Sequence, residues 1–458
     1  MASTHALVLP YPAQSHVMSL LEFSYCLLDR GFRVTFVVTE VQHGRLLATL
    51  VKEHGGRLPA GLRLASIPDG LGPGENRNDL GRLTEGIMSV MVASLEELIV
   101  GSSASDEERF TCLVADQSMA WALNVAKKTD LRCTAFFPAS ALVLAANFSV
   151  PKLIADGVID EEGVPKKPEK FRLSPEAPPM DPSLLCWNCF EDSKTRQRIF
   201  DYIVNNNEAL LDAELVACNT FHDLEEPIFR YAPNIVPIGP LKFGSRPDNT
   251  VGNFWLHDTT CIEWLDRQQS GSVIYVAFGS FTIMSQIQFE ELAIGLELTG
   301  RPFLWVVRPD LTDDTTDEMY PPGFAKRVSG RGKMVGWSPQ QKVLAHPSIA
   351  CFISHCGWNS TLDGVKNAVP FLCWPYFADQ FFNQTYVCDV WRVGLSMLVD
   401  KDGVYGREEI RSKVEELLGD EEIKLNSMAL KEKACQSVEK GGSSFENLDR
   451  FVDAIKEM

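Results

Sequence analysis

The sequence predicts an α/β protein with two doubly wound parallel-sheet domains that face a cleft. Its 458 residues exceed the length that one hydrophobic core usually supports. In both halves of the chain, short apolar runs alternate with stretches of helical periodicity, a pattern typical of parallel sheets with crossover helices. Between Tyr231 and Asp258 this pattern stops in a segment rich in Pro, Gly and Asn, as expected of an interdomain linker. The predicted boundaries are 1–242 for the first domain, 243–257 for the linker and 258–442 for the second domain.

The first half opens with a strand–helix–strand unit. The apolar run HALVLPYP (5–12) predicts one strand, and FRVTFVVT (32–39) predicts the next. Between them, apolar side chains recur at helical spacing, at Val17, Leu20, Leu21, Tyr25 and Leu28. Because such crossovers are right-handed, the two strands are expected to be parallel neighbours. CLVAD (112–116) and CTAFF (133–137), separated by a helical stretch, add two further strands.

The same pattern resumes after the predicted linker. Helical stretches such as 285–300 separate five short apolar runs, which predict a second parallel sheet: SVIYVAFGS, FLWVVRP, GKMVGW, IACFISH and PFLCWPY. Ligands of open α/β sheets bind beyond the carboxyl ends of the strands. We therefore expect a binding site in the cleft between the two domains.

Composition excludes several classes of partner. The net charge of -18 repels nucleic acid and anionic membranes, and no basic stripe offsets it. The sequence has neither a secretory leader pattern at its start nor an apolar stretch long enough to span a membrane. Its twelve Cys residues are scattered without a paired framework, which favours reduced thiols in a cytoplasmic protein. We expect no nucleic-acid partner and no membrane insertion.

The turn after IACFISH is the most informative local feature. A helix that starts there, capped by Asn359 or Ser360, would direct its amide N–H groups and the positive end of its dipole at an anion. Gly357 allows close approach, and His355 can donate to phosphate oxygens. An ordinary capped strand–turn–helix explains the same residues. A metal site has weaker support, because His346 and His355 have no acidic residues in a ligand pattern beside them. Hydrolase, P-loop and dinucleotide signatures do not occur in the sequence.

The segment from Trp337 to Gln380, WSPQQKVLAHPSIACFISHCGWNSTLDGVKNAVPFLCWPYFADQ, resembles the donor-binding signature of plant family-1 UDP-sugar glycosyltransferases along its whole length. PYPAQSH near the start, the Asp after CLVA and the VAFGS run extend the resemblance over nearly the whole chain. It implies the GT-B fold, with a Rossmann-like N-terminal domain that binds the acceptor and a Rossmann-like C-terminal domain that binds the UDP-sugar. It also implies that the last helix, 443–458, packs back on the first domain.

The resemblance assigns a role to each matching residue of the donor site. Trp337 would stack on uracil, with Ser338 and Gln340 reaching base and ribose. Asp363, where relatives usually have Glu, would bind the ribose hydroxyls at longer range or through water. Asp379 and Gln380 would bind the sugar hydroxyls, and Gln380 together with Trp358 implies glucose. The pyrophosphate would be held by His355, Gly357, Asn359 and Ser360, with Ser280 nearby.

Catalysis by members of this family implies a His base and an Asp partner. His16 matches the base, which removes the acceptor proton, and Asp116 matches the acid that orients the imidazole. Direct displacement would invert the anomeric centre without a covalent intermediate, and electrostatic stabilisation by the helix terminus would need no metal. Without the family, His16 is interpreted as a surface loop residue and Asp116 as a strand-end cap. Met18 departs from the common family pattern and would either line the acceptor pocket or pack in the helix.

Apolar residues in 85–91 and 136–148, together with Phe377, are candidates for the acceptor pocket, although stretches of this kind more often pack the core. An apolar pocket would suit a small lipophilic acceptor such as a phenolic or flavonoid, a terpenoid or a hormone. We therefore expect a monomeric UDP-glucose-dependent glucosyltransferase. The alternatives are transfer from another UDP-sugar, formation of N- or C-glycosides, and non-catalytic UDP-sugar binding.

Overall fold

The structure is a computed structural model that describes residues 4–102, 108–210, 216–241, 254–308, 311 and 319–457. The chain divides into two compact units, which are Met1–Trp255 with Gln436–Met458, and Leu256–Cys435. Residues 243–253, most of the predicted linker, lie outside the described residues. The chain rejoins the first unit at Gln436, earlier than the boundary at 443 expected from the sequence.

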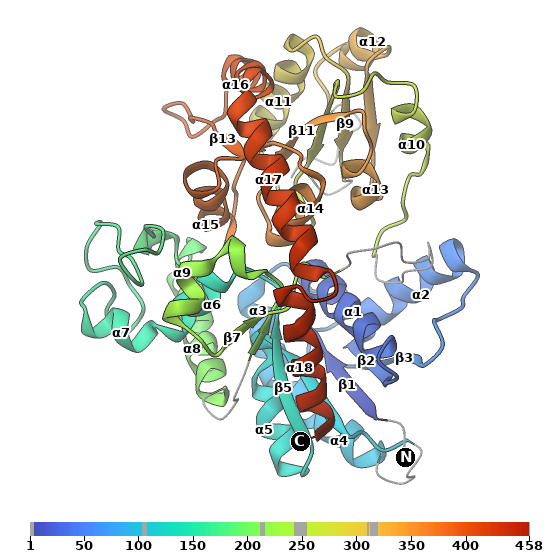
Figure 1. The fold of residues 1–458 in the computed structure, drawn as a ribbon, viewed down its shortest axis with the longest axis vertical. Coiled ribbons are helices and arrows are strands. Elements are labelled where there is room, and N and C mark those ends of the chain that lie inside the picture. Colours follow the sequence, from blue (N-terminus) through green and yellow to red (C-terminus); the bar gives the residue numbers. More distant parts are fainter. Residues whose placement is uncertain are drawn as a thin grey trace. The chain divides into compact units, whose positions relative to one another are not determined.

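The first unit is built on a parallel sheet of seven strands in the order β3-β2-β1-β4-β5-β6-β7 (Figure 1). The strands are β1 (His5–Leu9), β2 (Arg33–Thr39), β3 (Leu62–Ile67), β4 (Cys112–Asp116), β5 (Arg132–Phe137), β6 (Val216–Cys218) and β7 (Ile235–Pro237). Every residue of β1 and β4 is buried, because helices cover both faces of the sheet. The strand order changes direction between β1 and β4, so the carboxyl ends of these two strands form a topological switch point.

Helices of the first unit connect and cover these strands. They are α1 (Gln14–Leu28), α2 (Glu40–His54), α3 (Leu80–Gly86), the π-helical η1 (Ile87–Met91), α4 (Val92–Ser102), η2 (Gln117–Met119), α5 (Trp121–Lys128), α6 (Ala141–Phe148), α7 (Val150–Ala155), η3 (Pro182–Leu184), η4 (Cys186–Cys189), α8 (Ser193–Ala209), η5 (His222–Leu224), α9 (Glu226–Tyr231) and α18 (Ser443–Glu457). Apolar side chains of α1 recur at helical spacing and are buried against the sheet, which explains why this segment is helical.

The C-terminal helix α18 is part of the core of the first unit. It lies against β5 and β7, beside which Figure 1 draws it in dark red. The Phe451 ring lies 6.1 Å from the Phe23 ring of α1, and the Arg30 guanidinium on the same face donates to Asp449 at 2.6 Å. The structure therefore joins the two ends of the chain in one hydrophobic core.

Helix α6, which contains most of the candidate acceptor stretch 136–148, is almost wholly buried. A carboxylate of the chain itself occupies its N-terminus, since buried Glu225 accepts from the N–H groups of Ala141 and Leu142 at 2.8 and 2.9 Å. Two unpaired amides at the helix start are thereby satisfied. Core packing accounts for these residues.

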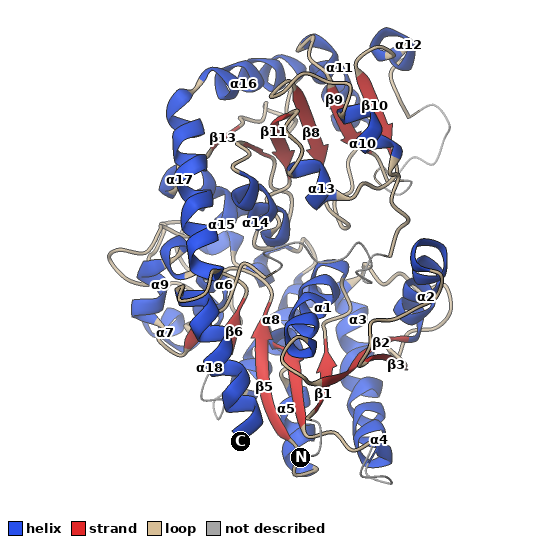
Figure 2. Cartoon of the chain, turned by 45° about the vertical axis from the view of Figure 1, so that its right-hand side comes forward, coloured by secondary structure: helices blue, strands red, loops and turns tan. Residues whose placement is uncertain are grey.

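The second unit repeats the architecture with six parallel strands in the order β10-β9-β8-β11-β12-β13 (Figure 2). The strands are β8 (Val273–Ala277), β9 (Phe303–Val306), β10 (Gly332–Val335), β11 (Ile349–Ser354), β12 (Phe371–Cys373) and β13 (Gly394–Ser396). The helices are α10 (Thr260–Leu265), α11 (Gln286–Leu298), α12 (Phe324–Val328), α13 (Gln340–Leu344), α14 (Trp358–Asn367), α15 (Gln380–Thr385), the π-helical η6 (Tyr386–Val390), α16 (Arg407–Gly419) and α17 (Glu421–Val438). Its switch point lies between β8 and β11.

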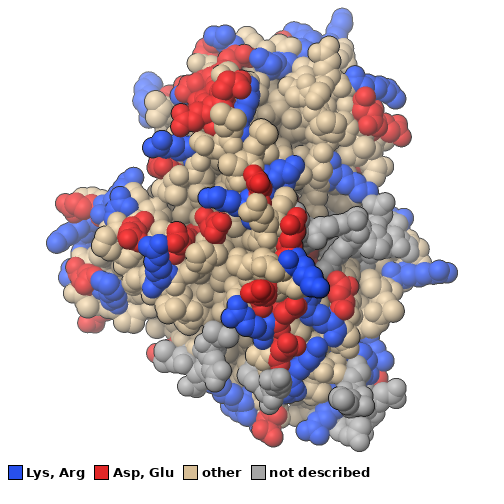
Figure 3. Space-filling view, viewed as in Figure 1, with Lys and Arg blue, Asp and Glu red and all other residues tan. Residues whose placement is uncertain are grey.

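Acidic and basic side chains are interspersed on the face drawn in Figure 3, where no basic stripe runs over either unit. Among the helices of the described residues, none is both long and apolar enough to cross a membrane.

Candidate active site

The switch point of the first unit brings His16 and Asp116 together. His16 lies in the first turn of α1, just beyond the end of β1, and Asp116 is the last residue of β4. His16 Nδ1 lies 2.7 Å from Asp116 Oδ2, which is hydrogen-bond distance. The carboxylate is fully buried, whereas the imidazole is 24% exposed. The pair therefore joins a buried charge to a ring that solvent reaches.

Backbone amides hold the Asp116 carboxylate in place. The Tyr11 amide donates to Oδ2 at 3.3 Å and the Ser118 amide to Oδ1 at 2.8 Å. Asp116 is thus also the N-cap of η2. The same carboxylate therefore acts as the strand-end cap expected from the sequence and contacts His16. With its oxygens fixed by these donors, the carboxylate can orient the imidazole.

Three residues that sequence reasoning missed support this pair. The Tyr11 ring packs on His16 with 5.2 Å between the ring centroids. From α8, the Tyr202 hydroxyl and the Asn206 amide both donate to the Ser118 carbonyl, at 2.5 and 3.2 Å. The sequence holds no signal for the α8 contacts, because more than 80 residues separate α8 from Ser118.

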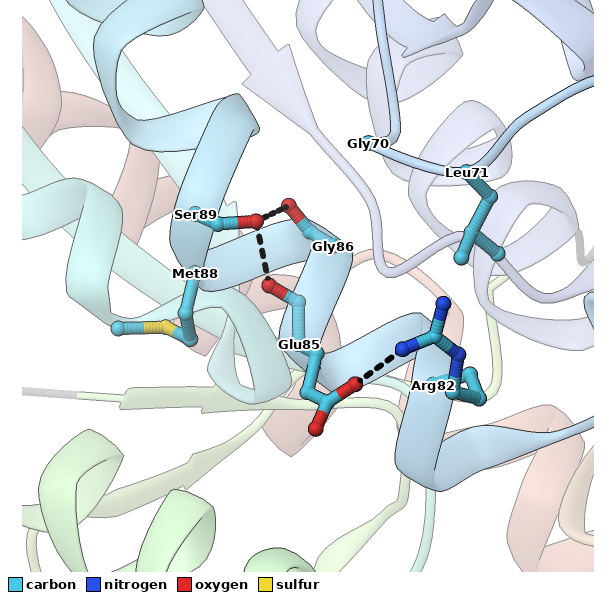
Figure 4. A pocket seen from close by; sticks show the side chains of 7 residues that line it. All are labelled: Gly70, Leu71, Arg82, Glu85, Gly86, Met88 and Ser89. Atoms are coloured by element: carbon cyan, nitrogen blue, oxygen red, sulfur yellow. Dashed lines mark hydrogen bonds and ion pairs between the residues drawn. The ribbon is translucent and has the colours of Figure 1, made fainter.

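A cavity of about 570 Å³ opens beside α3 and η1 in the first unit. Figure 4 shows the residues that line it: Gly70, Leu71, Arg82, Glu85, Gly86, Met88 and Ser89. The loop after β3 meets α3 at backbone level, since a Cβ on Gly86 would lie 2.3 Å from the Asp69 carbonyl oxygen. Within the candidate stretch 85–91, Ile87 and Met91 are buried in the core, whereas Met88 lines the cavity. Within this stretch, Ile87 and Met91 therefore pack in the core, and Met88 belongs to the pocket.

In the second unit, His355 lies between two glycines at the switch point. A Cβ on Gly279, after β8, would lie 2.5 Å from His355 Nε2, and a Cβ on Gly357 would lie 2.4 Å from the same atom. Both distances are shorter than real carbon contacts, so the imidazole fits only because neither position has a side chain. The sequence identified Gly357 but missed Gly279.

Helix α14 begins directly after this turn and presents its N-terminus there. The helix starts at Trp358 with Gly357 as its N-cap, and no side chain caps it. The predicted caps were wrong, because Asn359 and Ser360 lie within the first turn. Cys356 before the cap has a φ of 62°, the left-handed region that lets the chain turn sharply. A helix N-terminus of this kind can bind an anion.

Burial lowers the pKa of His355 to about 4, and the nearby Arg308 charge acts in the same direction. The backbone of Ala277 opposes this shift. The imidazole is therefore neutral near pH 7, so it would contribute a polar N–H rather than a positive charge to a bound anion.

Several predicted base and ribose residues form one hydrogen-bonded cluster on α13 and α14. The Gln340 amide donates to Ser360 Oγ and to Asp363 Oδ2, both at 3.1 Å. Ser338 joins through Tyr275, whose hydroxyl lies 2.8 Å from Ser338 Oγ. Lys366, which the sequence analysis did not identify, lies 3.1 Å from Asp363 and balances its charge.

Hydrogen bonds fix both residues that are predicted to contact the sugar, and one of them, Asp379, is linked to the turn before α14. Asn383, missed from sequence, donates to the Cys356 carbonyl at 2.8 Å and to Asp379 Oδ2 at 2.7 Å. Gln380 Oε1 accepts from the amides of Tyr376 and Phe377, at 2.8 and 3.0 Å. Gln380 therefore fixes the loop before α15 through its oxygen, and its amide nitrogen is the group left to recognise a ligand.

The remaining predicted residues flank this set. Trp337 is half-buried and directly precedes Ser338. Ser280 follows Gly279 in the loop after β8. Trp358 is buried, with its ring 6.3 Å from Trp391.

No group of three or more His, Cys, Asp or Glu in the described part of the chain could hold a metal ion.

Comparison with known proteins gives a consistent result. A sequence model of the family "UDP-glucoronosyl and UDP-glucosyl transferase" matches residues 252–437. UDP-glycosyltransferase 83A1 of Arabidopsis thaliana is 44% identical over 100% of this chain and 97% of its own length. Phytolacca americana UGT2, solved with UDP-2fluoro-glucose and pterostilbene, matches with a TM-score of 0.79 and 27% identity over 99% of each chain. A Polygonum tinctorium UDP-glucosyltransferase capable of glucosylating indoxyl was solved with 3,4-dichloroaniline. It matches with a TM-score of 0.82 and 30% sequence identity, over 99% of this chain and 99% of its own.

Proposed function

Because the chain belongs to the plant family-1 UDP-glycosyltransferases, enzymes with the GT-B fold that act on small molecules, we propose that it is an inverting glucosyltransferase. The proposed reaction moves glucose from UDP-glucose to a small lipophilic acceptor and forms a β-glucoside. The observation that carries the proposal is the 2.7 Å contact between His16 Nδ1 and the buried Asp116 carboxylate. A protein that only binds a UDP-sugar has no need of an oriented base.

The donor is proposed to bind the second unit. Its diphosphate would lie at the N-terminus of α14, where backbone amides and the neutral His355 donate to phosphate oxygens. Uracil would stack on Trp337, and the ribose would meet the Gln340 and Asp363 cluster. The helix dipole and these donors would stabilise the charge that develops on the leaving UDP. A metal-free reaction is part of this proposal.

The acceptor is proposed to lose its proton to His16 Nε2. With Nδ1 directed at Asp116, the opposite ring nitrogen is the basic one, and Asp116 would stabilise the imidazolium as it forms. Attack on the anomeric carbon from the face opposite UDP inverts the configuration. Leu71 and Met88 in the α3 cavity suit the apolar body of a phenolic, terpenoid or hormone acceptor.

Because all strands of the first sheet are parallel, the α3 cavity lies at the same sheet edge as His16. β3 is the second strand from β1 in the sheet, so the two strands lie about 10 Å apart.

We also propose that the enzyme acts in the cytoplasm as a monomer. Twelve cysteines without a disulfide support a reducing compartment.

A screen of small acceptors with UDP-glucose tests the function. We expect at least one phenolic, terpenoid or hormone acceptor to gain the mass of one hexose, with a β-linkage to oxygen by NMR. A parallel panel of UDP-sugars separates glucose from other donors, and linkage analysis separates O- from N- or C-glycosides. UDP binding without turnover of any acceptor would contradict the proposal and favour a non-catalytic binding protein.

Gln380→Glu tests whether the Gln380 amide recognises the sugar. Glutamate keeps an oxygen that accepts from Tyr376 and Phe377, but it loses the amide N–H groups. We expect kcat/KM for UDP-glucose to fall about tenfold, the effect of losing about one hydrogen bond to the sugar. The Kd of UDP, which lacks the sugar, should be unchanged. Gln380→His is a poorer test of donor choice, because it also removes the acceptor of the two amides. Equal kcat/KM for Gln380→Glu and wild type would show that Gln380 does not touch the sugar.

A further inference from the structure

Three thiols lie together at the turn that precedes α14, one of them in the turn itself. Cys373 Sγ, at the end of β12, lies 3.7 Å from Cys388 Sγ in η6. The Cys356 thiol of the turn also contacts Cys373. Cys373 and Cys356 are buried, whereas Cys388 is partly exposed. One thiol of the cluster is therefore within reach of a small oxidant, and it lies next to a buried partner.

We propose that Cys388 and Cys373 are a redox modification site, at which hydrogen peroxide drives formation of a reversible disulfide. The Cys388 thiolate attacks a peroxide oxygen, the O–O bond breaks, and a sulfenic acid and water result. Cys373 sulfur then attacks Cys388 sulfur, the S–O bond breaks, and the hydroxide leaves as water with the Cys373 proton. In total two thiols lose two electrons and two protons, and hydrogen peroxide becomes two water molecules.

The local backbone allows the two sulfurs to approach. Their separation must fall from 3.7 Å to about 2.05 Å. Cys388 lies in a single five-residue π-helical turn, Tyr386–Val390, and such turns are rare and frequent at functional sites. Burial, together with the neighbouring thiols of Cys356 and Cys388, raises the pKa of Cys373 well above its usual value. The partly exposed Cys388 is thus the thiol that reacts first with the oxidant.

Displacement of the Cys373 sulfur would reach the donor turn through short contacts. Cys373 pairs with Ser354 in the sheet, and the Trp374 amide donates to the Ser354 carbonyl at 2.8 Å. Ser354 Oγ accepts from the Cys356 amide at 3.1 Å. Moving the sulfur towards Cys388 opens a gap beside Cys356, and packed interiors respond to such gaps by shifting their neighbours. This effect on nucleotide affinity rests on the proposed function, whereas the disulfide itself does not.

The full-length protein is treated with hydrogen peroxide, digested without reduction and analysed by mass spectrometry. We expect a peptide pair linked through Cys373 and Cys388 that dithiothreitol separates. UDP titration before and after oxidation should show a Kd about tenfold higher, within the usual range of coupling between sites, with recovery after reduction. Cys388→Ser should bind UDP like wild type, form no link and keep its affinity in peroxide. Cys133→Ser, on β5 of the first unit, is the matched control and should respond like wild type.

The outcomes are distinct for each proposal. Oxidation of Cys388 only to sulfinic acid, or a link between Cys373 and Cys356, would overturn the proposed pair. Equal loss of UDP affinity in peroxide for Cys388→Ser and wild type would overturn its effect on the site. Failure of the reduced wild-type protein to bind UDP would instead count against the proposed donor site. The disulfide would still be tested by the linked peptide pair in mass spectrometry.

Discussion

His16→Ala is expected to lower kcat by about a hundred- to ten-thousandfold, the usual contribution of a general base. The reason is the geometry of the pair: Asp116 Oδ2 lies 2.7 Å from Nδ1, and the proposed mechanism assigns the acceptor proton to Nε2. Alanine removes this nitrogen, whereas the proposed UDP site is built from residues of the second unit. The Kd of UDP, measured by calorimetry, should therefore stay within twofold of wild type, while steady-state rates with the best acceptor collapse.

Two further variants sharpen this experiment. Asp116→Asn should also lower kcat, because the amide cannot stabilise an imidazolium and favours the wrong tautomer. His43→Ala on α2, the same substitution at another histidine of the first unit, should leave kcat unchanged. If His16→Ala turns over oxygen acceptors at the wild-type rate, another group is the base and the proposed mechanism is wrong.

Gly357→Ala is expected to raise the Kd of UDP about ten- to a hundredfold. The added methyl would lie 2.4 Å from His355 Nε2, so the ring would have to move, and a Cβ on Gly279 would crowd the same nitrogen. Overpacking of this kind costs about 1–3 kcal/mol. The backbone of Gly357 has a φ of -60° and a ψ of 144°, which alanine adopts without strain, so the clash alone is tested.

The control for this variant is Gly330→Ala, where a Cβ has no atom within 4 Å. Its UDP affinity and melting temperature should match wild type. A circular dichroism melt of Gly357→Ala separates local crowding from loss of the fold. Wild-type UDP affinity in a folded Gly357→Ala protein would show that the nucleotide does not depend on the turn around His355.

Strands buried on both faces could be predicted from the sequence, because they form continuous apolar runs. β1, β2, β4 and β5, and the central strands of the second unit, are examples. β3 was missed because its middle residues are partly exposed and it lies at the sheet edge, so its run is broken by polar residues. β6, β7 and β13 were not predicted and have only three residues each, too short a run for alternation to be recognised. β12 is as short, but it lies within the longer apolar run PFLCWPY and was predicted.

Residues that carry chemistry were easier to identify than those that position them. His16 and Asp116 were assigned through the family resemblance, as titratable groups at strand ends, and the structure brings them into contact. Tyr202 and Asn206 act through contacts across more than 80 residues, and Gly279 matters only because His355 packs on it. Local patterns hold no information on such distant contacts, which depend on how the sheet is assembled. The cap of α14 was misplaced by two residues or more, because Gly357 caps it without a side chain.

The central claim is that the N-terminus of α14, with His355 between Gly279 and Gly357, binds the diphosphate of UDP. A crystal structure of the protein with UDP tests it most directly. We predict phosphate oxygens within hydrogen-bond distance of the first amides of α14 and of the His355 ring, with uracil on Trp337. Electron density for UDP at any other place in the second unit, or in the first unit, would contradict the claim.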